Sequence, residues 1–270
     1  MHNIDHAPPD RRLQAFVRGY IQRRTPSPPA AVTVEPYVAR LGGMLDFLFA
    51  DLYDICVPGM GFIPCFAAAV VGPHTHGRIQ LRIRGRVEEF VILLHPQGIH
   101  QLFGEPAHLF VNTGYEAQAV LGPEIRQLHQ RLGNAVDFRE RTRLADAFLL
   151  GQLRDAERTD RSSKAFDAIV AADCPLTVAE AARQAGLSVR QLERKCLQYT
   201  GLSPKMLGRI SRFERAMALR RASGAQWTTI AHELEYSDQM HMIRDFRSLA
   251  GDTPGRIMQR ISADHLISVP

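Results

Sequence analysis

Apolar residues recur at helical spacing through the last third of the chain, and the same pattern occurs there in two successive copies. The first copy begins with a series on one helical face, at Val178, Ala181, Ala182 and Ala185. Gly186 would end this helix in the left-handed conformation that a side chain disfavours. A second apolar series then begins, at Val189, Leu192 and Cys196. A short helix, a turn with glycine and a second helix form a helix-turn-helix.

The second copy repeats the small, apolar and turn residues of the first at an offset of 49 residues up to Ser237 and 50 residues after it. The matching positions are Ala231, Ser237, Met242, Phe246 and Gly251, against Ala182, Ser188, Leu192, Cys196 and Gly201. A register kept over this length predicts a duplicated structural unit.

A single long helix is predicted between the two copies. Ser203 and Pro204 are typical of an N-cap followed by proline at the first helical position. The apolar stripe then continues through Met206, Leu207, Ile210, Phe213, Met217 and Leu219. A helix of about 18 to 20 residues is ~30 Å long, and successive major-groove faces of DNA lie ~34 Å apart. Such a linker, with Phe213 and Met217 locking both units to it, would place the two second helices in adjacent groove segments.

The polar side of the second helix in each unit is suited to reading base edges. In a helix-turn-helix this helix lies in the major groove, where arginine can bind guanine and glutamine can bind adenine through two hydrogen bonds. A solvent-exposed helix face carries the same residue types, so one such helix alone does not distinguish a DNA-reading helix from an ordinary surface helix. The segment from 176 to 261 holds 14 Lys and Arg against 8 Asp and Glu, while the rest of the chain holds 19 against 20. Two helices in register within a basic segment favour DNA.

The two units, the linker helix and the motif residues of the second unit resemble the DNA-binding domain of AraC/XylS-type transcriptional regulators. The motif residues are Ser237-Asp238-Gln239, Phe246-Arg247, Gly251 and Thr253-Pro254. The chain departs from the family pattern at Glu235, where glycine is usual, at Met242, where Phe is usual, and at Asp245, where a small residue is common. Glu235 in a left-handed turn costs about 1 kcal/mol, so we expect the second unit to read DNA more weakly.

The site residues expected from this reading form two groups. Those predicted to contact bases are Arg190, Gln191, Arg194, Gln239, Met240, His241 and Arg244. Those predicted to contact the DNA backbone are Ser188, Lys195, Gln198, Lys205 and Arg247.

The N-terminal half has strand patterns followed by helical ones. Alternation of Ile79, Leu81 and Ile83 with polar residues predicts a half-buried strand, and the apolar run Phe90–Leu94 predicts a core strand. Other strand-like runs are Ala31–Val34, Leu45–Leu52 and Phe66–Val71, and helical periods follow at Gln97–Phe103, Pro123–Leu132 and Phe138–Ala156. The fold class predicted is an α+β N-terminal domain, an antiparallel sheet with helices behind it, followed by an all-α domain with two helix-turn-helix motifs.

These patterns divide the chain into an effector-sensing or dimerisation domain over 1–158, a linker over 159–164 and a DNA-binding domain over 165–262. The early segment Phe16–Tyr20, which follows a short amphipathic stretch from Arg11, the turn Gly72–Thr75 and a later apolar helix are also similar to the N-terminal domain of one branch of AraC-type regulators. By that resemblance the helix over Phe138–Leu153 would carry a homodimer seam. Packing of that helix on the sheet is the equal alternative.

Candidate chemistry in the N-terminal half is sparse. His74 and His76 could begin a cupin metal site, but Gln80 and Leu81 stand where a carboxylate ligand is needed, so no metal is predicted. The arginines at 78, 82, 84 and 86 form either an anion-binding face or a solvated one. The cysteines, at 56, 65, 174 and 196, have no zinc spacing, and Cys196 is expected to pack. With no catalytic set and no phosphate-cradling loop, neither an enzyme nor a cofactor is predicted.

The composition, 45% apolar and 23% charged, is that of a globular protein. No apolar run reaches the ~18 residues of a membrane span and the first residues lack a signal pattern, so we expect a cytoplasmic protein without membrane contact. Expected partners are double-stranded DNA, the transcription machinery, a small-molecule effector and a second copy. A ligand-independent regulator controlled by a protein partner is the alternative. An Ada-like alkyl-repair protein is remote, because Cys56 and Cys65 do not supply its zinc centre.

Overall fold

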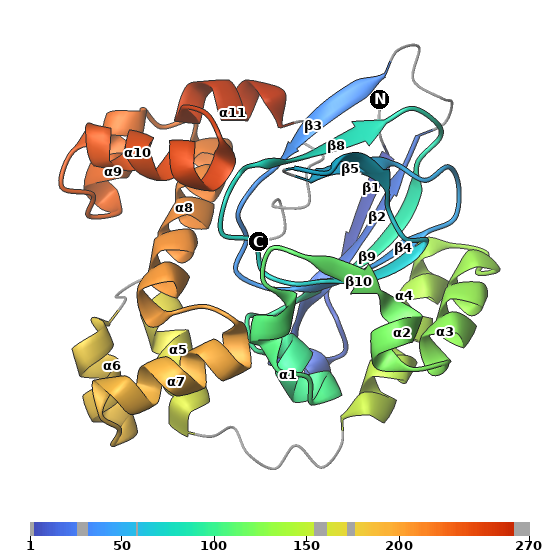
Figure 1. Cartoon of the computed structure of the whole chain (residues 1–270), viewed down its shortest axis with the longest axis horizontal. Coiled ribbons are helices and arrows are strands. Elements are labelled where there is room, and N and C mark those ends of the chain that lie inside the picture. The colour runs from blue at the N-terminus through green and yellow to red at the C-terminus, as the bar shows by residue number, and fades with distance from the viewer. Residues whose placement is uncertain (1–2, 26–31, 58, 154–160, 172–175, 262–270) are drawn as a thin grey trace.

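The computed structural model describes residues 3–25, 32–57, 59–153, 161–171 and 176–261. Its N-terminal part is a pair of antiparallel sheets with helices on one outer face (Figure 1). The six-stranded sheet runs β1 (Asn3–Ala7), β2 (Val17–Arg24), β9 (Glu88–Leu94), β4 (Met44–Leu48), β7 (Ala68–Val71) and β10 (Gly114–Glu116). The four-stranded sheet runs β3 (Thr33–Tyr37), β8 (Ile79–Ile83), β5 (Asp54–Val57) and β6 (Gly61–Pro64).

Strands β9 and β4, in the middle of the larger sheet, are buried on both faces, which explains their runs of apolar residues. On β9, Phe90 and Ile92 belong to the core shared with the helices, whereas Val91 and Leu93 belong to the core between the two sheets. A strand covered on both sides loses the polar positions of a half-exposed one. The covering helices are α1 (Gly98–Phe103), α2 (Ala117–Leu121), α3 (Glu124–Gly133) and α4 (Phe138–Gln152), with short 3₁₀ turns at Arg11–Leu13 and Ala107–Phe110.

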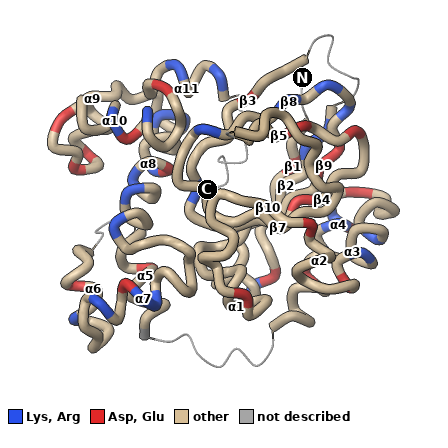
Figure 2. The backbone as a smooth tube through the Cα atoms, in the orientation of Figure 1, with Lys and Arg blue, Asp and Glu red and all other residues tan. Residues whose placement is uncertain are grey.

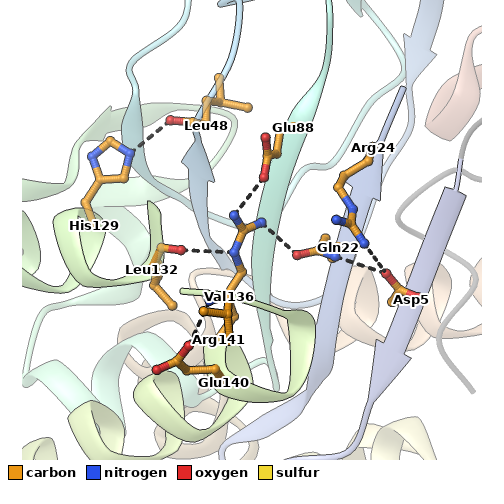
Figure 3. Close-up of polar contacts among 10 residues, drawn as sticks. All are labelled: Asp5, Gln22, Arg24, Leu48, Glu88, His129, Leu132, Val136, Glu140 and Arg141. Carbon is orange, nitrogen blue, oxygen red and sulfur yellow. Dashed lines mark hydrogen bonds and ion pairs between the residues drawn. The ribbon is translucent and has the colours of Figure 1, made fainter. Parts of the chain in front are cut away.

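One buried arginine attaches α4 to the sheet (Figure 3). Arg141, 4% exposed, donates to Gln22 Oε1 on β2 and to Glu88 Oε1 on β9, each at 2.7 Å. Its Nε donates to the carbonyl of Leu132 at the end of α3, at 3.0 Å. A buried guanidinium is tolerated only when its donors are paired. The apolar residues of α4 pack against the sheet core, which is the intramolecular alternative for this helix.

The C-terminal part is helical throughout its described residues. Its elements are α5 (Arg161–Val170), α6 (Val178–Ala185), α7 (Val189–Thr200), α8 (Pro204–Ser223), α9 (Trp227–Glu233), α10 (Gln239–Ala250) and α11 (Pro254–Arg260). Figure 1 shows α8 running between the group α5–α7 and the group α9–α11. Phe213 and Met217 of α8 are fully buried, and the Phe213 ring lies 4.8 Å from that of Phe246 on α10.

The N-terminal part contacts both ends of this helical region. On α8, Glu214 accepts from the backbone N–H of Leu41 at 2.8 Å and pairs with Arg18 at 3.1 Å. The N–H of Ala39 donates to the Leu249 carbonyl on α10 at 2.8 Å. At the other end, His100 of α1 stacks on Tyr199 of α7 with ring centroids 4.4 Å apart. Val38, Ala39 and Leu41 pack into the apolar core formed by the C-terminal helices.

The predicted fold class is confirmed, with corrections in detail. The stretch around Arg11–Tyr20 is a 3₁₀ turn followed by the start of β2, and β5, β6 and the second sheet were not predicted. Helix α4 ends at Gln152, four residues before the predicted end. Of the predicted linker over 159–164, positions 159 and 160 lie outside the described residues, and the rest is helical because α5 already begins at Arg161. Of the helices that the structure describes, none has the length and apolarity needed to cross a membrane.

Candidate nucleic-acid interface and ligand cavity

The first helix-turn-helix unit, α6 and α7, is fixed by side-chain caps at both helix starts. Thr177 caps α6 in a reciprocal pair with Glu180, and Ser188 caps α7 in a reciprocal pair with Gln191. Gly186 between them has φ +67°, as predicted from the pattern. Two capping boxes and a left-handed glycine make the turn geometry a local property of the sequence.

The second unit, α9 and α10, reaches the same shape with less favourable residues. Glu235 occupies the left-handed position with φ +55°, which confirms the conformation expected there, one that a side chain disfavours. Asp238 caps α10, accepting from the N–H of His241 at 2.6 Å. Asp245 on α10 is 4% exposed and pairs with Arg209 of α8 at 2.6 Å.

Most of the residues predicted to contact bases lie on the exposed faces of α7 and α10. Those that are exposed are Arg190, Gln191, Arg194, Gln239, Met240 and Arg244, and His241 is half-buried. Among the residues predicted to contact the backbone, Ser188, Gln198, Lys205 and Arg247 are exposed and Lys195 is half-buried.

Two of the residues predicted to contact bases already have local partners. The Gln191 side-chain oxygen accepts from the Ser188 N–H at 2.9 Å, so Gln191 cannot both cap α7 and offer an amide oxygen to adenine. The ring of His241 lies 5.3 Å from that of Tyr236, and its Nδ1 lies 3.1 Å from the Ser237 hydroxyl. Both contacts tie their residues to the turn of the unit.

Two exposed apolar residues of α7, Val189 and Leu197, were not predicted from the pattern, whereas Met240 on α10 was predicted to be exposed. Val189 was placed in the core series but is 42% exposed, because it is the first helical residue of α7. Leu197 on α7 is 48% exposed and Met240 on α10 is 54% exposed. Apolar side chains on a recognition helix suit the methyl group of thymine.

Basic residues gather on α8, between the two units (Figure 2). A groove of about 640 Å³ lies along this helix, lined by Lys205, Arg209, Arg212 and Arg215 and, from the second unit, by Glu233, Glu235, His241 and Asp245. The guanidinium of Arg212 lies over the Tyr236 ring at 5.1 Å. Lys205 stands near the N-terminus of α8, close to Ser203, which caps that helix.

A family model described as a helix-turn-helix domain matches residues 181–260, from within α6 through the linker helix and the second unit to the end of α11. Together with the capped double unit, this match decides the nature of the region. The C-terminal region is an AraC-type helix-turn-helix domain.

Solved structures extend the likeness beyond the AraC-type domain. The chain is similar in fold to ToxT from Vibrio cholerae, with a TM-score of 0.52, 11% identity and coverage of 97% of this chain and 99% of that one. A second ToxT structure, bound to (E)-4-(8-methylnaphthalen-1-yl)but-3-enoic acid, has a TM-score of 0.52 and 9% identity over 96% of this chain and 98% of that one. At such identity the likeness shows the fold alone. No curated protein matches the chain by sequence.

A cavity of about 230 Å³ lies between the two sheets, away from the AraC-type domain's exposed helices. Its walls are mostly apolar and come from both sheets, with Tyr37, Met44, Ile79 and Leu81 among them. Met60, 68% exposed, and Phe66, 46% exposed, also belong to the lining. The polar groups of the lining include Asp46, Tyr53 and His74.

The other candidate groups of the N-terminal part have structural partners. His74 is buried, with Nδ1 3.3 Å from the Gly72 carbonyl, and burial lowers its pKa to about 3. Arg82 and Arg84 both pair with Asp54 on the neighbouring strand β5. Within the described ranges, no three histidine, cysteine or acidic side chains come together as a metal site. Cys196 packs in the core with 0% exposure, as predicted, while Cys174 lies outside the described residues.

Proposed function

We propose that this chain is a sequence-specific transcription regulator that reads two successive major-groove segments of double-stranded DNA. The observation that carries the proposal is the pair of exposed, capped helices α7 and α10 at the two ends of α8. A helix of 20 residues is ~30 Å long, close to the ~34 Å that separates groove segments on one face of the duplex.

The residues predicted from the sequence divide between the two groove segments. Arg190 and Arg194 on α7 would read bases in one segment, and Gln239, Met240 and Arg244 on α10 in the other. Gln191 and His241 would contribute mainly by holding the turns, since both have local partners. Backbone contacts would come from Ser188, Lys195, Gln198, Lys205 and Arg247, which lie on or beside the same helices.

The N-terminal part is proposed as the effector domain, with the cavity between its sheets as the ligand site. The segment from Tyr37 to Met44 supports this coupling, because both of its ends line the cavity. Its middle residues Val38, Ala39 and Leu41 pack in the core of the AraC-type domain. A ligand that shifts Tyr37 would therefore act directly on the contacts to α8 and α10.

Two further expectations belong to this proposal. The domain limits 1–158 and 165–262 would divide sensing from DNA binding, with α5 as the first helix of the second domain. Contact with the transcription machinery is expected of a regulator of this type. Homodimer formation through α4 is the less supported option, because its apolar residues pack on the sheet. A regulator controlled by a protein partner instead of a ligand would leave the cavity unused.

The test is selection of duplexes from a randomised library by the full chain, followed by titration at several salt concentrations. We expect a selected sequence with two half-sites, and an affinity that falls by about 0.9 log units per phosphate contact for each decade of salt. A folded chain that binds no duplex at low salt would refute the proposal.

A further inference from the structure

The exposed face of α7 carries a carboxylate among its basic residues. This face consists of side chains that are all exposed and lie three or four positions apart, namely Arg190, Glu193, Arg194 and Leu197. All four line one hollow of about 630 Å³ on the surface of the first unit, together with Ser203, the N-cap of α8. The proposed function places this face in the major groove, so the charge of Glu193 would lie between two strands of phosphates.

The stability of α7 does not account for this carboxylate. An acidic residue stabilises a helix from its first turn, as a cap, or by pairing with a basic residue four positions on. Glu193 is the fifth residue of α7, and Ser188 and Gln191 already cap the helix. The residue four positions on is Leu197. The Glu193 side chain also makes no hydrogen bond or ion pair with any residue that the structure describes.

The other acidic residues of the AraC-type domain mostly have partners. Five of the eight acidic residues between 176 and 261 cap a helix or pair with a basic residue, namely Glu180, Glu214, Asp238, Asp245 and Asp252. Within the described ranges, Glu233 and Glu235 have no side-chain partner either, but both line the groove beside the arginines of α8. Of the three unpaired acids, Glu193 alone lies on a recognition helix.

The second unit shows that the fold does not require an acid at this position. The register offset of 50 residues makes Ile243 of α10 equivalent to Glu193, and Ile243 is half-buried. The next residue is arginine in both helices, at Arg194 and Arg244. The two recognition faces therefore share an arginine, and a carboxylate stands beside it only in the first.

A carboxylate in the major groove distinguishes between bases. Cytosine presents its N4 amino group there as a hydrogen-bond donor, and Glu or Asp accepts from it. Without that donor, the carboxylate faces only phosphates and the acceptor atoms of other bases, and it is repelled. One group can therefore favour a single base and disfavour other duplexes.

We propose that Glu193 reads a cytosine in the half-site contacted by α7, by accepting a hydrogen bond from the N4 amino group, and that it weakens binding to duplexes without this base. The inference rests on the proposed function. It makes the target sequence asymmetric, because Ile243 places no such requirement on the half-site contacted by α10.

The experiment is selection of duplexes from a randomised library by the full chain and by its Glu193→Gln variant. The relevant half-site is the one where Arg194→Ala relaxes discrimination. We expect the parent chain to select cytosine at one position there, by about tenfold over other bases. In Glu193→Gln the preference should move to adenine, because glutamine binds the N6 and N7 edge of that base.

A second variant separates reading from repulsion. Glu193→Ala should lose the preference at this position, and its affinity for a duplex without the site should rise about threefold at low salt, since one repelled charge is gone. Glu233→Ala is the matched control, because it removes an exposed, unpaired acid of the same domain that lies outside the recognition helices. Its base preference should equal that of the parent chain.

A measurement on the unmodified chain decides the inference even if a variant fails to fold. N4-methylcytosine still pairs with guanine, but its methyl group replaces the N–H that faces the major groove. At the selected position it should weaken binding by about tenfold, as the loss of a hydrogen bond to a charged group implies.

Three results would overturn the inference. They are a parent chain that selects no cytosine in this half-site, equal binding of the methylated duplex, and a folded Glu193→Gln chain that still selects cytosine. Each is seen with a chain that binds DNA, so each refutes this inference alone. A folded chain that binds no duplex refutes the proposed function instead.

Discussion

The two helix-turn-helix units have one shape but are stabilised differently. In the first unit the left-handed position is Gly186, and the residue at position 195 of α7 is a half-buried lysine. In the second unit the equivalent positions are Glu235, with φ +55°, and Asp245, buried against Arg209 of the linker helix. The first unit is therefore encoded locally, by glycine and caps. The second depends on α8 to hold it.

Removing the aromatic contact between α8 and α10 should have the largest effect. Phe213→Ala deletes a ring that is fully buried and lies 4.8 Å from Phe246. We expect the free energy of unfolding to fall by about 3–5 kcal/mol, measured by urea denaturation. Phe213→Leu, which keeps most of the volume, should cost under about 1.5 kcal/mol. A loss below 1 kcal/mol for the alanine variant would show that α8 does not hold the second unit in this way.

The two recognition helices should differ in what they contribute to DNA affinity. Arg194→Ala should cost about 1–3 kcal/mol of binding to the best site and relax discrimination at one or two base pairs. Arg244→Ala, at the equivalent position, should act in the other half-site and cost less. Lys205→Ala is the control, because a phosphate contact weakens all sequences equally. A uniform loss across a randomised library for Arg194→Ala would contradict its role as a base reader.

Breaking the ion pair between α8 and α10 should affect only the second unit. Arg209→Ala leaves Asp245 buried without its partner, and we expect a loss of about 1–2 kcal/mol, since Arg209 is partly exposed. The double replacement Arg209→Met with Asp245→Leu should restore most of it, because an apolar pair avoids the desolvation cost. Equal stability of the single variant and the parent would mean that the pair is incidental.

The smallest effect is expected at the left-handed turns, where the units offer a matched pair. Glu235→Gly should stabilise the chain by about 1 kcal/mol, since glycine tolerates positive φ. Gly186→Ala, at the equivalent turn, should destabilise it by a similar amount. Thermal unfolding of both variants measures the difference. The two substitutions must change the melting temperature in opposite directions. A lower melting temperature for Glu235→Gly would instead indicate a stabilising contact made by the glutamate side chain.

The sequence could predict the first unit almost completely because its signals are local. Gly186, Ser203 and Pro204 each determine a cap or a turn within a few residues, and the structure places all three as expected. Ser188, predicted only as a contact to the DNA backbone, also caps α7. Helix α8 also follows from its apolar stripe. The exposure of Val189 was not predicted because apolar periodicity shows which face of a helix is buried, but not whether the first residue of the helix reaches the core.

The N-terminal part was predicted less well because its signals are distant. Strand β2 carries buried Gln22 and Arg23, whose partners Arg141 and Glu35 lie far along the chain or on the other sheet. From the sequence alone, two adjacent polar residues in a strand indicate a solvent-exposed segment. Only the structure shows that distant partners allow Gln22 and Arg23 to be buried. The cavity likewise assembles residues from Tyr37 to Gly114, none of which has a local signature.

Footprinting of the full chain on a selected duplex tests the central claim most directly. The account predicts two protected segments for each protomer, one helical turn or about 10 base pairs apart. Arg194→Ala should weaken one of them and Arg244→Ala the other. Protection of a single segment by each protomer, or loss of both segments in either variant, would contradict the claim that the two units read DNA as a pair set by α8.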